Sequence, residues 1–95
     1  MSVVIVGGHD RMHTRYNEIC KKRGCKCKVF TQFPANLQKQ IGSPDFIIVF
    51  TKTVAHKMLN VASTQAERVG AVVKHCNSSS ATALNEILDE CMQGA

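Results

Sequence analysis

The chain has 95 residues, of which 44% are hydrophobic and 20% charged, and its formal net charge is +5. This composition is typical of one globular domain, and no apolar stretch approaches the roughly 20 residues that cross a bilayer. The opening MSVVIVGG also lacks the basic region and the longer apolar core of a secretory signal, so we expect a cytoplasmic protein without a membrane partner.

Strands and helices alternate from the start of the chain. Ser2–Val6 is a short apolar run with three valines, which predicts a strand that is buried on both faces. Apolar residues then recur at helical spacing from Met12 onward, and this pattern predicts a helix that ends before Gly24. The alternating sequence KCKVF at Lys26–Phe30 predicts the second strand.

The middle of the chain repeats this alternation. Pro34 followed by ANLQKQI predicts a short helix with proline in its first turn and Gly42 as its stop. The run FIIVFT at residues 46–51 predicts the third strand. A third helix is expected after it, with Thr53 as its capping residue and its apolar stripe ending at Val69.

The last two elements complete the pattern. AVVKHC at residues 71–76 predicts a fourth strand, and Asn77 with the serines at 78–80 is expected to open the last helix. Strands that alternate with helices through short connections imply a parallel sheet covered on both faces. We therefore predict an α/β fold: one domain over residues 1–95, with a small doubly wound, Rossmann-like or flavodoxin-like sheet of four parallel strands.

The five cysteines and a basic stretch each have an ordinary explanation. Without an export signal the cysteines are expected to be thiols, and Cys25-x-Cys27 is too tight for the usual metal knuckle. Residues 21–28 hold five of the twelve basic residues and no acid, which keeps nucleic-acid binding as an alternative. We favour cations that complement a helix C-terminus, because no aromatic side chains interleave with the charges.

All four histidines follow or end a predicted strand. His9 and His13 come after the first strand, His56 after the third, and His75 ends the fourth. Ligands of open α/β sheets bind outside the carboxyl ends of the strands, so these imidazoles are expected at one edge. Imidazole suits iron, zinc, copper or nickel, and the constellation predicts a metal site.

Other side chains near this edge are possible donors to the same site. Cys76, Asp10 and Tyr16 are candidates, with Cys76 as the first additional ligand. Cys76 beside His75 could also be a nucleophile, but neighbouring residues of a strand point to opposite faces, which weighs against that role.

An anion site is the competing interpretation of the same edge. Gly7 and Gly8 after a strand can present backbone N–H groups to a phosphate, although the nucleotide fingerprints are absent. Ser78, Ser79 and Ser80 before the last helix can also hold an anion, although such residues are favoured as helix caps and we expect at least one to cap. An anion- or nucleotide-binding regulatory module therefore stays open.

With these residues in view, the chain resembles a bacterial family known as domain of unknown function 2325. The resemblance rests on VVIVGGHDRM, KVFTQ, GSPD, TVAHKM and NSSS, and it covers essentially the whole chain. It implies a small α/β domain that acts as a homodimer. It further implies that the protein holds non-haem iron, as one ion or as a two-iron site, and that this site binds dioxygen.

The resemblance also suggests roles for individual residues. His9 of GGHDR and His56 of TVAHKM are the first candidates for metal ligands, while His13 fits the cluster. The segment before NSSS leaves open whether His75 or Cys76 is a ligand. Supporting contacts to the ligands or to an anion are expected from Arg11, Tyr16 and Lys57.

The expected function is therefore metal binding rather than catalysis, with no catalytic residue assigned. One chain offers few carboxylates near the edge, and a twofold dimer would duplicate each ligand. We expect a homodimer that holds iron, with zinc or another divalent ion as the alternative, and binds dioxygen or a similar small ligand. Anion binding and nucleic-acid binding are the alternatives.

Overall fold

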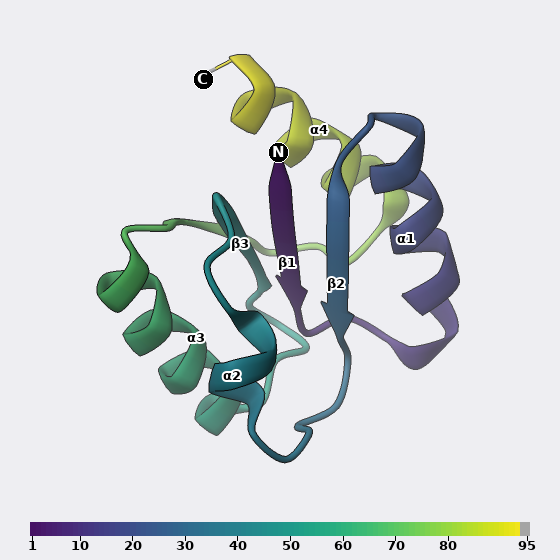
Figure 1. The fold of residues 1–95 in the computed structure, drawn as a ribbon. Helices are drawn as coiled ribbons and strands as arrows, with labels where there is room; N and C mark the ends of the chain where they lie inside the picture. The colour runs from purple at the N-terminus through teal and green to yellow at the C-terminus, as the bar shows by residue number, and fades with distance from the viewer. Residues whose placement is uncertain (94–95) are drawn as a thin grey trace.

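A computed structural model describes residues 1–93 of the chain, and it confirms the small doubly wound sheet (Figure 1). Four parallel strands lie in the order β2-β1-β3-β4. They span Ser2–Val6 (β1), Lys26–Phe30 (β2), Phe46–Phe50 (β3) and Val72–Cys76 (β4). The chain moves outward from β1 to β2 and then returns to the other side of β1. The switch point, where such folds bind ligands, therefore lies at the carboxyl ends of β1 and β3.

Helices cover both faces of the sheet. Helix α1 (His13–Lys22), which follows a 3-10 turn at Asp10–Met12, and α4 (Ala81–Gln93) lie on one face, and α2 (Leu37–Ile41) and α3 (His56–Val69) lie on the other (Figure 1). Two apolar clusters fill the layers between them. Alternate residues of β1 supply each cluster: Val3 and Ile5 face α1 and α4, and Val4 and Val6 face α2 and α3.

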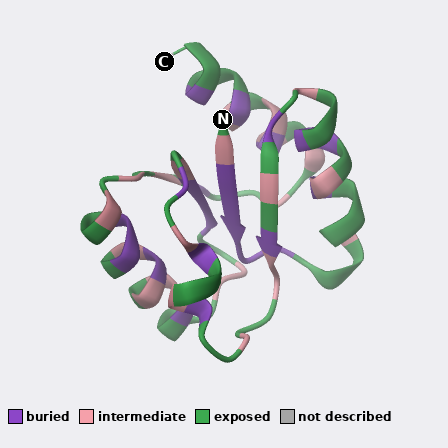
Figure 2. Ribbon diagram, viewed as in Figure 1, coloured by how far each residue is buried: buried purple, intermediate pink, exposed green. Residues whose placement is uncertain are grey.

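The two central strands are buried and the two edge strands are half exposed (Figure 2). Strands β1 and β3 each have a neighbour on both sides and helices on both faces, which explains their continuous apolar sequences. Strand β2 carries exposed Lys26 and Lys28 along its outer edge. Charged side chains at such an edge oppose pairing with another sheet.

Two predicted helix starts are wrong. Pro34 does not lie in the first turn of α2, which begins at Leu37 after Asn36 in a left-handed conformation (φ 59°). Thr53 does not cap α3, which begins at His56 with Ala55 in the capping position. The chain forms a turn after β3 instead, in which the Thr53 N–H donates to the Phe50 carbonyl at 3.0 Å.

The other helix boundaries follow the sequence closely. Gly42 and Gly70 end α2 and α3, both with positive φ. The Ser80 hydroxyl caps α4 by accepting the Ala83 N–H at 3.1 Å, as expected for at least one of the serines. All five cysteines are free thiols. Within residues 1–93, none of the helices combines the length and apolar character that crossing a bilayer requires.

Candidate functional site

The loops that follow β1 and β3 are held against each other at the switch point. The Gly8 N–H donates to the Thr53 hydroxyl oxygen at 2.8 Å. A side-chain carbon at Gly7 would lie 3.2 Å from the Cβ of Val54, so the two loops are in close contact there as well. Thr53 thus holds the loop after β3 against the loop after β1. The sequence predicts Thr53 only as a helix cap, so this contact could not be foreseen.

Asp10 ties the loop after β1 to the loop after β2. Its carboxylate accepts hydrogen bonds from the Thr31 hydroxyl and, at 2.7 Å, from the side-chain amide of Gln32. The hydrogen bond from Thr31, followed by that from Gln32, holds the pKa of Asp10 below its usual range. Asp10 is therefore engaged in organising the edge, with each of its carboxylate oxygens accepting one hydrogen bond. In the sequence, the only indication of this contact is that two polar residues, Thr31 and Gln32, directly follow β2 in KVFTQ.

Tyr16 links α1 to the loop before α4. Its side chain is fully buried, and its hydroxyl donates to the Ser79 carbonyl at 2.6 Å. The ring packs against Phe50 with 5.1 Å between centroids. Burial raises the pKa of this phenol above its usual value. Tyr16 therefore stabilises the carboxyl edge of the sheet from within the core, and its hydroxyl is engaged by the Ser79 carbonyl.

We expect Tyr16→Phe to lower the free energy of unfolding by about 1–2 kcal/mol at neutral pH, because the Ser79 carbonyl loses its donor. The deficit should shrink as the pH rises above about 10, the ordinary tyrosine pKa. Because the pKa of Tyr16 is higher in the folded than in the unfolded state, the unfolded chain loses this proton first as the pH rises. The wild-type protein therefore loses stability above the ordinary tyrosine pKa, whereas the variant has no phenol to ionise. Urea unfolding of both proteins across this range, followed by circular dichroism, measures the effect. A deficit that grows with pH contradicts it.

The structure brings the loop that bears His9 next to the loop that leads into His56, the first residue of α3. His9 follows Gly8, and His56 lies three residues after Thr53, so both histidines are close along the chain to the hydrogen bond that joins these two loops. Both side chains are exposed. Neither ring takes part in a hydrogen bond with another described residue, which leaves their nitrogens available to a ligand.

The other two histidines lie on either side of this pair. His75 is exposed on β4 and pairs in register with Val49, so it lies on the face covered by α3. His13 begins α1, and its Nδ1 lies 3.3 Å from the side-chain nitrogen of Asn17. It lines a hollow with residues of β2, at the opposite edge of the sheet from β4.

Cys76 points away from His75. It pairs with Phe50, whose side chain belongs to the cluster under α1 and α4. Its buried thiol donates to the Ser78 carbonyl at 3.0 Å. His75 and Cys76 therefore lie on opposite faces of the sheet, as their adjacency in a strand requires.

Within residues 1–93, one copy of the chain shows no complete set of metal ligands. In the part of the chain that the structure describes, no group of three or more His, Cys, Asp or Glu side chains is arranged to hold a metal ion. The donor chemistry at the edge suits iron or zinc, but the number of donors in one copy is too small. Arg11 and Lys57 are exposed beside His9 and His56 and are free of ion pairs with the described residues.

The groups proposed for an anion are mostly engaged with the protein. The Gly7 N–H donates to the Phe30 carbonyl at 2.9 Å, and the Gly8 N–H donates to Thr53. Among the serines, the Ser78 hydroxyl accepts the Ser80 N–H at 3.3 Å, and Ser80 caps α4. These contacts weigh against an anion site built on the glycine turn.

The basic stretch at 21–28 is also partly used within the fold. Arg23 forms an ion pair with Asp89 of α4 at 2.6 Å and donates to the side chain of Asn85 at 3.1 and 3.2 Å. Lys28 donates to the Gln40 carbonyl at 2.8 Å. These cations hold α1, α4 and α2 in place, which weighs against a free nucleic-acid surface here.

Comparison with known proteins identifies the chain at the level of its family. No curated protein and no solved structure matches it. The model of the family described as "Uncharacterized protein conserved in bacteria (DUF2325)" matches residues 2–91, which is nearly the whole chain and includes every strand and histidine discussed above. The chain therefore belongs to the DUF2325 family.

Proposed function

We propose that two copies of the chain together bind a metal ion, with iron as the first candidate, through His9 and His56 at the carboxyl edge of the sheet. The observation that carries the proposal is the hydrogen bond from the Gly8 N–H to the Thr53 hydroxyl. It joins the loop that bears His9 to the loop that leads into His56 at the start of α3, near the switch point, where this fold places its ligands. The metal donors in each chain would be the imidazoles of His9 and His56, which are exposed and form no hydrogen bond with another described residue.

A homodimer supplies the donors that one chain lacks. A twofold axis beside the switch point would bring together a second His9 and a second His56, because each ligand is duplicated across the axis. Four imidazoles satisfy iron or zinc, and His75, which is exposed on the α3 face of β4, is a further candidate donor. The number of ions per dimer is one or two, depending on whether the axis passes through the ion.

The protein would act as a binding or sensor protein for a small ligand such as dioxygen. Iron held by nitrogen donors with an open coordination position binds small diatomic molecules, which is the chemistry that the metal would supply. The chain's own contribution is to orient the imidazoles through the Gly8–Thr53 contact. Arg11 and Lys57 place positive charge beside the same edge and would attract an anionic or polarised ligand.

Metal analysis of single variants tests the assignment. Protein expressed with added iron should contain stoichiometric metal, and His9→Ala or His56→Ala should each lower the metal affinity by more than the roughly 10–100-fold typical of losing a supporting partner. His13→Ala is the matched control, because His13 lies toward the β2 edge and should leave the metal content unchanged. Elemental analysis of the dialysed proteins gives the result.

Two further measurements separate the parts of the proposal. Sedimentation velocity should show a dimer that dissociates when a chelator removes the metal, and the anaerobic iron-loaded protein should change its visible absorption reversibly when dioxygen is admitted. Metal retained in both His9→Ala and His56→Ala removes the assigned ligands. A colourless, metal-free wild type whose melting temperature rises with nucleotides favours the anion-binding alternative instead.

A further inference from the structure

Three of the five cysteines lie at the junction between α1 and β2. Cys20 belongs to the last turns of α1, Cys25 to the turn that follows, and Cys27 to β2. The Cys25 N–H donates to the Cys20 carbonyl at 2.9 Å, so the chain turns tightly from the helix into the strand. All three side chains lie in or against the apolar cluster under α1 and α4. The fold therefore concentrates free thiols in one small region.

The side chains of Cys20 and Cys27 meet where α1 packs on β2. Cys20 lies within the apolar cluster, and Cys27 packs against that cluster from the strand. The two thiols are in hydrogen-bonding contact. This contact holds the pKa of Cys20 below its usual value, and the same contact raises the pKa of Cys27. The first proton lost from the pair therefore leaves a thiolate on Cys20, stabilised by the S–H group of Cys27.

The other cysteines have environments typical of structural residues. A buried free cysteine usually acts as a small hydrophobic side chain. Burial raises the pKa of both Cys25 and Cys91, which keeps these thiols protonated. The Cys76 thiol donates to the Ser78 carbonyl at 3.0 Å. Contact between one thiol and another thus distinguishes the pair formed by Cys20 and Cys27.

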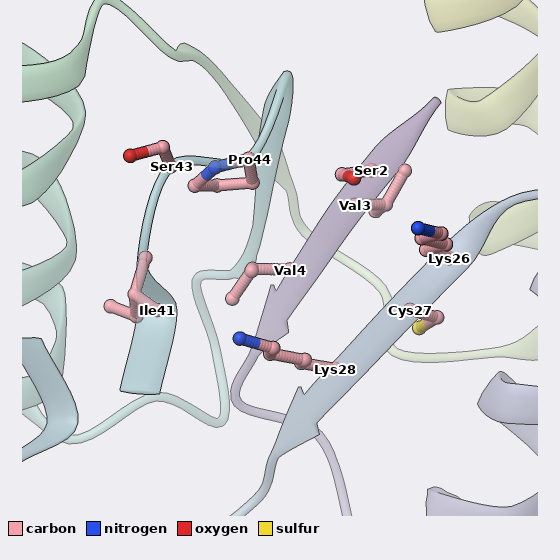
Figure 3. Close-up of a pocket in the computed structure, with 9 residues that line it drawn as sticks. All are labelled: Ser2, Val3, Val4, Lys26, Cys27, Lys28, Ile41, Ser43 and Pro44. Atoms are coloured by element: carbon pink, nitrogen blue, oxygen red, sulfur yellow. The ribbon is translucent and has the colours of Figure 1, made fainter. Parts of the chain in front are cut away.

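Cys27 is the member of the pair that a small molecule can approach. It is half-buried on an edge strand, whereas Cys20 is fully buried. Cys27 lines a hollow of about 380 Å³ together with His13 and Asn17 of α1. It also lines a hollow of about 290 Å³ that extends from β2 across Val4 (Figure 3). An oxidant of a few atoms can therefore reach the pair through Cys27 from the edge of the sheet.

We propose that Cys20 and Cys27 are an oxidation site at which hydrogen peroxide converts the two thiols into an intramolecular disulfide. The Cys27 sulfur attacks one peroxide oxygen: an S–O bond forms, the O–O bond breaks, and hydroxide leaves with the thiol proton as water. The Cys20 sulfur then attacks the Cys27 sulfur: the S–S bond forms, the S–O bond breaks, and a second water leaves with the proton of Cys20. The thiols lose two electrons and two protons, and peroxide is reduced to water.

The two positions suit the two steps. The first step needs a sulfur that the oxidant can reach, and Cys27 provides it. The raised pKa of Cys27 makes this step the slower one, because the thiolate is the nucleophile. The second step needs a thiolate already in contact with the oxidised sulfur. Cys20 meets this condition through its lowered pKa and its contact with Cys27.

Oxidation of the full chain followed by peptide mapping tests the proposal. Because two thiols join, excess hydrogen peroxide should lower the number of free thiols in the wild type from five to three. Dithiothreitol should restore all five. Trypsin cleaves after lysine and arginine, so the disulfide should join the peptide of residues 16–21 to that of residues 27–28. Mass spectrometry without reduction identifies this product, which has two hydrogens fewer than the separate peptides.

Cys27→Ala should abolish the disulfide, and Cys25→Ala is the matched control. Cys25 is a neighbouring thiol that donates to the Arg23 carbonyl at 3.9 Å, so its removal should leave the disulfide unchanged. The wild type in urea verifies that the peroxide is active, because its unfolded thiols are oxidised without the fold. If Cys27→Ala does not fold, the peptide map of the wild type decides.

Four results in the folded wild type overturn the proposal. The first is no loss of thiols under conditions that oxidise the chain in urea. The second is a disulfide that contains Cys25, Cys76 or Cys91. The third is a disulfide between two chains, and the fourth is a Cys27 that takes up oxygen without forming a disulfide.

Discussion

Gly8→Ala is expected to destabilise the fold by about 3 kcal/mol or more. Gly8 has a φ of +88°, and a Cβ there would lie 2.7 Å from both Cε2 and the hydroxyl oxygen of Tyr16. The left-handed conformation costs a side chain roughly 1–2 kcal/mol, and forcing an atom into filled space costs about 1–3 kcal/mol more. Tyr16 is held from the other side by Phe50 and Ser79, so it has little freedom to withdraw. Urea unfolding monitored by circular dichroism measures the loss.

Gly24→Ala is the matched control for this prediction. Gly24 also has a positive φ of +73°, but a Cβ there would meet no atom within 4 Å. Its replacement should therefore lower the free energy of unfolding only by the cost of a side chain in the left-handed conformation, about 1–2 kcal/mol. The difference between the two variants isolates the collision with Tyr16. Equal losses would mean that the edge can relax around a methyl group, and the close approach would then not constrain the site.

This contact also explains why two glycines follow β1. A glycine pair after a strand usually indicates a backbone that approaches a phosphate, and that interpretation motivated the anion alternative. In the structure the absent side chains make room instead for protein atoms: Val54 and Phe50 beside Gly7, and Tyr16 beside Gly8. The glycines bring His9 close to the loop of His56, so their role is to pack the edge.

The sequence predicts strands far better than the first turns of helices. The bounds of β1 and β2 match the expected residues. The apolar run of β1 and the alternating sequence of β2 each stop at the residue where the strand ends, so the hydrophobic pattern marks the strand directly. The starts of α2 and α3 depend instead on turns that no periodicity encodes. Thr53 has the composition of a helix cap, but its hydroxyl is 45 residues away along the chain from the Gly8 N–H that it accepts. A tertiary contact outweighs the local preference there.

The location of the candidate site was predictable, but its internal arrangement was not. Parallel topology alone places residues after β1, β3 and β4 at one edge. The short 3-10 turn at Asp10–Met12 then carries His13 onto α1 beside Asn17, and this step cannot be inferred from spacing. The engagement of Asp10 by Thr31 and Gln32 likewise requires β2 to lie next to β1 in space.

Phe50→Ala is expected to cost about 3–5 kcal/mol, the range for removing a buried phenylalanine ring. Phe50 is fully buried at the end of β3, where it packs on Tyr16 and belongs to the cluster under α1 and α4. Its carbonyl also accepts the Thr53 N–H that shapes the loop before His56. A cavity at this position therefore removes support from the core and from the candidate site together. Thermal and urea unfolding give the size of the loss.

Phe33→Ala separates the effect of burial from that of losing an aromatic ring. Phe33 is 47% exposed in the loop between β2 and α2, so its removal should change stability by no more than about 0.5 kcal/mol. Comparable losses in the two variants would contradict the packing of the α1–α4 layer described above. If Phe50→Ala is costly and Phe33→Ala is not, the edge that carries His9 and His56 rests on a rigid core.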